Sequence, residues 1–119
     1  MRKDDILGLN FDLYPRQSFG AGDIVLGEGT ETDRLLVVLS GRLGFGSASK
    51  PLGPGDVVKP IEFFGASHYA GMVRGRIAGE VAVLPRGAVR ACLNAQGPMT
   101  WNLACALAIE ALAATKEHA

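Results

Sequence analysis

The sequence predicts a mainly β fold that ends in helices. All sixteen glycines and six prolines lie between Gly8 and Pro98, and the residues after Pro98 contain neither. Before Pro98, short apolar runs alternate with glycine-containing turns, a pattern typical of strands. From Met99 to about Lys116 the chain carries no helix breaker, which favours one long helix.

The strands are expected to be short, because turn residues recur at close intervals. The run IVL at 24–26 lies between glycines 22 and 29, and the run LLVVL at 35–39 stops at Ser40-Gly41. Glycine adopts positive φ without steric cost and is therefore common in tight turns. We expect strands near residues 16–19, 24–26, 34–40, 43–46, 57–59, 70–76 and 80–84, with turns at 21–22, 40–41, 53–55 and 78–79.

Two helices are expected to follow the strands. Pro85 suits the first turn of a short helix that runs through Val89 and Leu93. Gly97-Pro98 then interrupts the chain, and the long helix begins at Met99. We therefore expect one domain over residues 1–119, with the β region at about 14–85 and the helices at about 86–116.

The long helix is apolar nearly all round. Between Met99 and Ala114 its only polar residues are Thr100, Asn102 and Glu110. A helix with two apolar faces needs two partners. We expect the β region to cover one face and a second copy of the helix to cover the other, because small residues permit close approach. The alternative is a solvated, alanine-rich face. The candidate homodimer interface consists of Trp101, Ala104, Leu107, Ala108 and Ala111.

Composition limits the classes of partner. Twelve basic and twelve acidic residues give a formal net charge of zero, so no overall field attracts nucleic acid or an anionic membrane. Cys92 and Cys105 lie outside any metal-binding spacing, and we expect buried thiols rather than a disulfide or a zinc site. The N-terminal segment resembles neither a signal peptide nor a membrane span, which predicts a cytoplasmic protein.

Several segments together resemble the cyclic-nucleotide-binding domain family, the module of catabolite activator proteins, kinase regulatory subunits and gated channels. The matching segments are AGD at 21–23, EG at 28–29, DRLLVVLSGRL at 33–43, LGPGDVV at 52–58 and EVAVLPRGAVRACL at 80–93. The resemblance covers about residues 14–115. It implies a double-stranded β-roll of the jelly-roll type, followed by helices.

The family's phosphate-binding cassette is altered in this sequence. In the family, a Gly-Glu pair opens a short helical turn, the Glu binds the ribose hydroxyl, and a later Arg binds the cyclic phosphate. When the segment GDVV at 55–58 is placed on the family's turn, Lys59 and Pro60 fall at the Gly-Glu positions and Tyr69 falls at the arginine position. Proline has no side-chain acceptor, and a tyrosine hydroxyl carries no positive charge at neutral pH. The resemblance therefore implies a fold without the usual nucleotide chemistry.

Other residues offer substitute ligands for an anion. Arg74 and Arg76 share one face of an expected strand, where they form either a phosphate clamp or a solvated surface. Glu62 lies two residues beyond the missing glutamate, where it either replaces it or is solvated. The aromatic residues near this loop plug the pocket, stack on a ligand or pack into the core. The candidate ligand-binding residues are Arg74, Arg76, Tyr69, Glu62 and Phe64.

Enzymatic functions fit the sequence poorly. A metal-dependent cupin has a similar strand pattern but needs several histidines, and this chain has only His68 and His118. No serine or cysteine lies in a recognisable catalytic pattern, so we expect no catalytic residues, no metal and no cofactor. Transcription factors of the family continue into a helix-turn-helix domain; we expect none here, and no direct DNA binding.

The hypothesis that follows is a small, stand-alone, non-enzymatic regulatory module that binds another protein or itself. The alternatives are an atypical sensor of cAMP or cGMP and, less favoured, a cupin-like enzyme.

Overall fold

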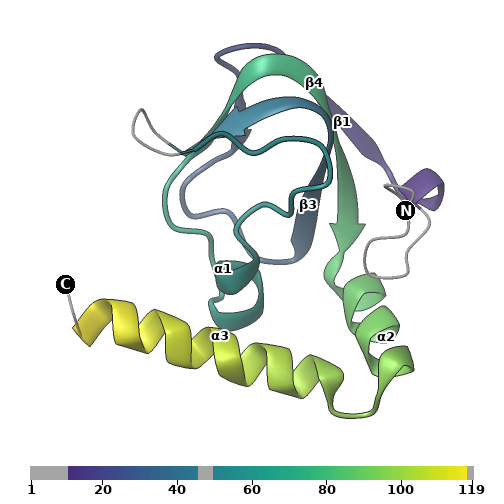
Figure 1. Ribbon diagram of the computed structural model, residues 1–119, viewed down its shortest axis with the longest axis vertical. Coiled ribbons are helices and arrows are strands. Elements are labelled where there is room, and N and C mark those ends of the chain that lie inside the picture. The colour runs from purple at the N-terminus through teal and green to yellow at the C-terminus, as the bar shows by residue number, and fades with distance from the viewer. Residues whose placement is uncertain (1–10, 46–49, 118–119) are drawn as a thin grey trace.

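The computed structural model describes residues 11–45 and 50–117. Figure 1 shows a strongly curved sheet, a short helix beneath it and a long helix that lies across the bottom of the molecule. The elements, in chain order, are a 3-10 turn (Phe11–Leu13), β1 (Arg16–Phe19), β2 (Ile24–Leu26), β3 (Arg34–Gly44), α1 (Pro60–Gly65), β4 (Val73–Pro85), α2 (Arg86–Gln96) and α3 (Thr100–Glu117). An antiparallel sheet followed by helices confirms the predicted fold class.

Strand β4 is the centre of the sheet. It pairs antiparallel with β3 on one edge, from Arg34↔Pro85 to Gly44↔Arg74. Its other edge is shared by β1, which pairs with residues 79–82, and by β2, which pairs with residues 73–74. The described sheet is open, with the order β1-β4-β2 and β3 beside β4.

Two predicted turns are wrong, because their glycines serve close packing inside long strands. The chain does not turn at Ala78-Gly79: a Cβ at Gly79 would collide with the backbone of Ser40 on the paired strand. Likewise β3 continues through Ser40-Gly41, where Gly41 has φ +82° and the register with β4 shifts at a bulge. Glycine permits both the bulge and the close approach of two backbones.

The remaining predicted strands and turns fit the structure with smaller changes. The strands at 16–19 and 24–26 and the turns at 21–22 and 53–55 are confirmed, with positive φ at Gly22 and Gly55. The strand expected at 57–59 is only a bridge from Val57 to Val37. The strand expected at 43–46 merges into β3, and its last residue lies outside the described part of the chain. Helix α1 was not among the expected elements.

The core lies inside the curved sheet and extends to the helices. Four consecutive residues of β3, 35–38, are buried, as expected for a strand covered on both faces. Apolar side chains of β4, Phe63 of α1, Val89 of α2 and Trp101 of α3 complete this core. The thiols of Cys92 and Cys105 are half-buried and pack against the core, whereas the sequence analysis expects them to be buried in it.

Helix α3 packs mainly against α1 (Figure 1). Trp101 makes edge-to-face contacts with Phe63 and Phe64, with ring centroids 6.2 and 5.4 Å apart. Further along α3, Ala108 lies against Gly65, where a Cβ would be only 2.9 Å from the Ala108 carbonyl carbon. Within the described ranges, none of the helices has the length and apolar character needed to cross a membrane.

The Gly65 contact generates a stability prediction. We expect Gly65→Ala to lower the free energy of unfolding by about 1–3 kcal/mol, because the added methyl group overpacks the α1–α3 contact. Denaturant unfolding followed by circular dichroism measures this change. Gly87→Ala is the matched control, since a Cβ at Gly87 of α2 meets nothing within 4 Å, and it should stabilise the protein slightly. Equal stability of the two variants would contradict the proposed close contact.

Candidate functional site

The segment from Lys59 to Val73 occupies the place of the altered cassette and forms a short helix with a returning loop. Lys59 has the left-handed conformation, with φ 46° and ψ 56°, and α1 follows at once with Pro60 in its first turn. This conformation is unfavourable for a residue with a Cβ. It stands at the position where the family resemblance expects glycine, the residue that adopts this conformation without steric cost.

Lys59 and Glu62 fasten the loop to α1; we call this arrangement the Lys59–Glu62 clamp. Lys59 Nζ donates to the Ala70 carbonyl oxygen at 2.8 Å, and the Ala70 amide donates to Glu62 Oε1 at 2.8 Å. The two charged groups lie 3.4 Å apart, and their side chains are only 17% and 20% exposed. Charge-assisted hydrogen bonds of this kind are among the stronger ones. Glu62 is thus engaged with protein groups rather than solvated.

Tyr69 fills the core beneath this loop. Its residue is 1% exposed, and its hydroxyl donates to the Arg34 carbonyl oxygen at 2.7 Å. Its amide donates to the Thr30 carbonyl oxygen at 2.7 Å, and its own carbonyl accepts from Gly29 at 2.9 Å. Burial raises the pKa of the Tyr69 phenol above its ordinary value. The side chain at the family's arginine position is therefore neutral and points into the protein.

The other aromatic residues near this loop also pack inside the chain. Phe63 is fully buried, and Phe64 is half-buried with its ring 5.0 Å from that of Phe63. Among the interpretations that the sequence left open, packing into the core describes Phe63 and Tyr69. Phe45, from the end of β3, lies under the Lys59 ammonium at 5.1 Å.

Arg74 and Arg76 lie on the exposed face of β4, whose opposite face carries the buried residues Val73 and Gly75. Arg74 Nη1 donates to the Gly22 carbonyl oxygen at 3.2 Å. The guanidinium of Arg76 lies over Gly44 of the paired strand, where a Cβ would collide with it. The structure does not bring these two arginines together with Tyr69, which points into the core on the other side of the sheet surface.

The candidate interface residues on α3 divide into two groups. Trp101 and Ala108 are 7% and 6% exposed and pack against the rest of the chain. Leu107 is 57% exposed, while Ala104 and Ala111 are half-buried. These last three residues line a hollow of about 350 Å³, together with Pro60, Ile61, Phe64 and Ala108. This hollow is almost entirely apolar.

Two features of this region were missed by the sequence analysis. Ser67 Oγ and His68 Nδ1 lie 2.9 Å apart on neighbouring residues, although no serine–histidine contact was expected. The guanidinium of Arg86, the first residue of α2, lies over two adjacent rings, with its central carbon 4.9 Å from the centroids of both Phe63 and Trp101. The aromatic partners come from distant parts of the sequence, so no local pattern indicates this arrangement.

In the described part of the chain, no group of three or more His, Cys, Asp or Glu residues could hold a metal ion. His118 lies outside the described residues.

Tyr69→Phe tests whether the buried phenol belongs to the core. We expect a loss of about 1 kcal/mol in unfolding free energy near neutral pH, because the hydrogen bond to Arg34 disappears. The raised pKa of Tyr69 means that the unfolded chain releases its proton first, so folding loses stability as pH rises above about 10. The variant should lack this part of the alkaline decline in urea unfolding experiments. Equal slopes for both proteins would contradict the burial of a neutral phenol.

Comparisons with known proteins bear on the fold. No protein-family model and no curated protein matches the sequence. Among solved structures, the chain is similar to a cyclic nucleotide-binding-like protein from Brucella abortus, at 19% identity and a TM-score of 0.53, over 70% of this chain and 78% of that one. An EAL enzyme in a half-site-occupied form has a TM-score of 0.63 at 14% identity, over 87% of this chain and 98% of that one.

A third similar structure is the regulatory subunit of a cAMP-independent protein kinase A from Trypanosoma brucei, a triple mutant bound to cAMP in its A site. It has a TM-score of 0.58 and 24% identity, and the match covers 70% of this chain and 34% of the subunit. These likenesses concern the fold alone. The chain has a cyclic-nucleotide-binding-like fold.

Proposed function

We propose that this chain is a non-enzymatic regulatory module that acts through protein contacts and does not bind cyclic nucleotide in the family's usual way. The observation that carries the proposal is the burial of Tyr69, whose side chain is held by Arg34 of β3 at the position where a phosphate-binding arginine is expected. The Lys59–Glu62 clamp supports it, since both charges are used by the loop itself.

The protein contact that we propose is a second copy of this chain on the outer face of α3. Leu103 and Leu107 are 59% and 57% exposed, and their spacing of one helical turn places them on one stripe. Leu107 also borders the apolar hollow between α1 and α3. A protruding leucine and a hollow on the same surface suit a two-fold interface, where each copy supplies both.

The charge of this surface supports self-association. Between residues 100 and 114 of α3, Glu110 is the only charged side chain, so two helices can approach without repulsion along most of their length. The Ala104 and Ala111 side chains at the hollow are small enough for close packing of helices. The fold of a kinase regulatory subunit among the similar structures is compatible with a regulatory role.

Cyclic nucleotides test the first part of the proposal. We expect no change in the thermal unfolding midpoint with saturating cAMP or cGMP. A ligand at about a hundred times its dissociation constant adds roughly 2.7 kcal/mol, which shifts the midpoint of a domain of this size by several degrees. A shift that disappears in an Arg74→Ala/Arg76→Ala variant would overturn the proposal in favour of an atypical nucleotide sensor.

Self-association is tested by Leu107→Glu. We expect the wild-type chain to sediment as a dimer whose dissociation depends on concentration, and the variant to sediment as a monomer, because a carboxylate in an apolar interface is desolvated without a partner. Ile77→Glu is the matched control: Ile77 is 60% exposed on β4, away from α3. A monomeric wild-type protein, or equal effects of both variants, would contradict the interface.

A further inference from the structure

Arg86 has an unusual environment for a residue at the start of a surface helix. Its guanidinium lies over the adjacent rings of Phe63 and Trp101, and Nη1 donates to the carbonyl oxygens of Thr32 at 3.0 Å and Phe63 at 2.6 Å. Its amide donates to the Asp33 carbonyl oxygen at 2.8 Å. These contacts fix the orientation of the planar guanidinium, so its remaining donors have defined directions.

Two nitrogens of the Arg86 side chain make no hydrogen bond within the described part of the chain. Both side-chain hydrogen bonds of this residue leave from Nη1. Among the described residues, no buried side-chain nitrogen or oxygen lacks a hydrogen-bond partner. Nε and Nη2 are therefore not fully buried. Arg86 borders a hollow of about 370 Å³, which lies between residues 31–33 and residues 66–68.

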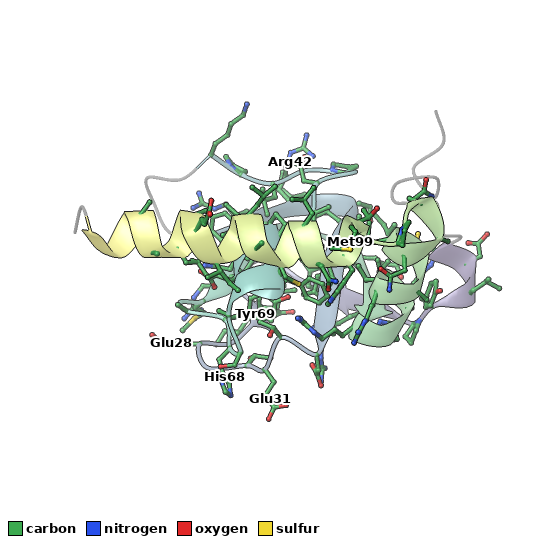
Figure 2. The ribbon with its side chains drawn as sticks, turned by 90° about the horizontal axis from the view of Figure 1, so that it is seen from below. Glu28, Glu31, Arg42, His68, Tyr69 and Met99 are labelled. Carbon is green, nitrogen blue, oxygen red and sulfur yellow. The ribbon has the colours of Figure 1, made fainter. Side chains whose placement is uncertain are left out.

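Acidic, basic and neutral polar residues line the hollow. Its lining residues are Glu31, Thr32, Asp33, Ala66, Ser67, His68 and Arg86. Figure 2 shows Glu31 and His68 at the same edge of the molecule, opposite Arg42, and their backbones form an antiparallel bridge. Ser67 Oγ and His68 Nδ1 lie within hydrogen-bond distance of each other. These groups come from two segments that the bridge holds in register.

The two carboxylates of the hollow differ in their engagement. Asp33 is paired with Arg34, whose Nε lies 2.9 Å from Asp33 Oδ1, and this hydrogen bond lowers the pKa of the Asp33 carboxyl. Asp33 is therefore ionised and already neutralised by its neighbour. Glu31 is exposed and is the other carboxylate that lines the hollow. The hollow is thus lined by a guanidinium of fixed orientation and by an exposed carboxylate.

We propose that this hollow binds a small zwitterion of the α-amino-acid class. The ligand carboxylate would accept from Arg86 Nε and Nη2, since two parallel donors match the geometry of a carboxylate. The ligand ammonium would lie against Glu31. A simple anion fits less well, because the Glu31 carboxylate lines the same hollow. The volume suits a single small molecule at the lower end of the range for ligand pockets.

The binding test uses three probes that separate the two charges: L-alanine, acetate and methylammonium. Amide resonances followed by two-dimensional nuclear magnetic resonance should shift at Thr32, Asp33, Ser67 and His68 with L-alanine. Affinity for L-alanine should exceed that for acetate or methylammonium, because only the zwitterion engages both ends of the hollow. The absence of these shifts at millimolar L-alanine, or shifts confined to other parts of the chain, would overturn the proposal.

Two carboxylate variants supply a matched pair. Glu31→Gln should weaken L-alanine binding roughly tenfold, equivalent to about one charge-assisted contact, and leave acetate binding unchanged. Glu28→Gln is the control, because Glu28 is an exposed carboxylate of the same loop that does not line the hollow, and it should bind L-alanine as the wild type does. Equal effects of the two variants would overturn the assignment of Glu31.

Arg86→Lys tests the other end of the ligand. It keeps the positive charge but removes the second parallel donor, so binding of both L-alanine and acetate should fall at least tenfold. Circular dichroism tests whether the Arg86→Lys variant is folded. If it is unfolded, the comparison of Glu31→Gln with Glu28→Gln decides the proposal. Acetate binding as strong as that of L-alanine, together with no effect of Glu31→Gln, would reduce the site to a carboxylate site and reject the zwitterion.

Discussion

The guanidinium of Arg86 joins the start of β3 to the helices α1 and α3. It bonds the backbone at Thr32, just before β3, and the backbone of α1 at Phe63, and it stacks on Trp101 of α3. Thr32 is itself buried and donates to the Ala66 carbonyl oxygen at 2.6 Å. Lysine could not reproduce this geometry, because an ammonium is a point charge without a planar face to lie over the two rings. The position of α3 therefore depends on a polar group from the start of α2.

The segment from Lys59 to Val73 is held by contacts among its own residues. The left-handed residue, the short helix and the returning loop are present, but their polar groups bond one another through the Lys59–Glu62 clamp. On the core side of the same segment, the neutral hydroxyl of Tyr69 donates to the Arg34 carbonyl oxygen. The polar groups of this loop are thus used in contacts within the chain.

Local turn chemistry made much of the fold predictable, and long-range contacts set the limits. Gly22 and Gly55 form the turns that the sequence indicates, because a positive φ is a local requirement. Gly79 also looks like a turn residue in the sequence, but glycine is needed there because the backbone of Ser40 on the paired strand leaves no room for a Cβ. Likewise the orientation of Tyr69 and the ring contacts of Arg86 depend on residues fifteen or more positions away. The fold class and the altered cassette were accessible from the sequence, whereas the Arg86 hollow was not.

The pairing of the strands has a consequence for how the chain is made. Each of β1, β2 and β3 pairs with β4, so the three earlier strands emerge from the ribosome before the strand that completes their ladders. The pairs join distant positions, such as Arg16 with Ala82, and such non-local pairing slows folding. During synthesis the apolar run of β3 must wait with an open edge, which is the condition under which nascent chains associate with one another or with chaperones.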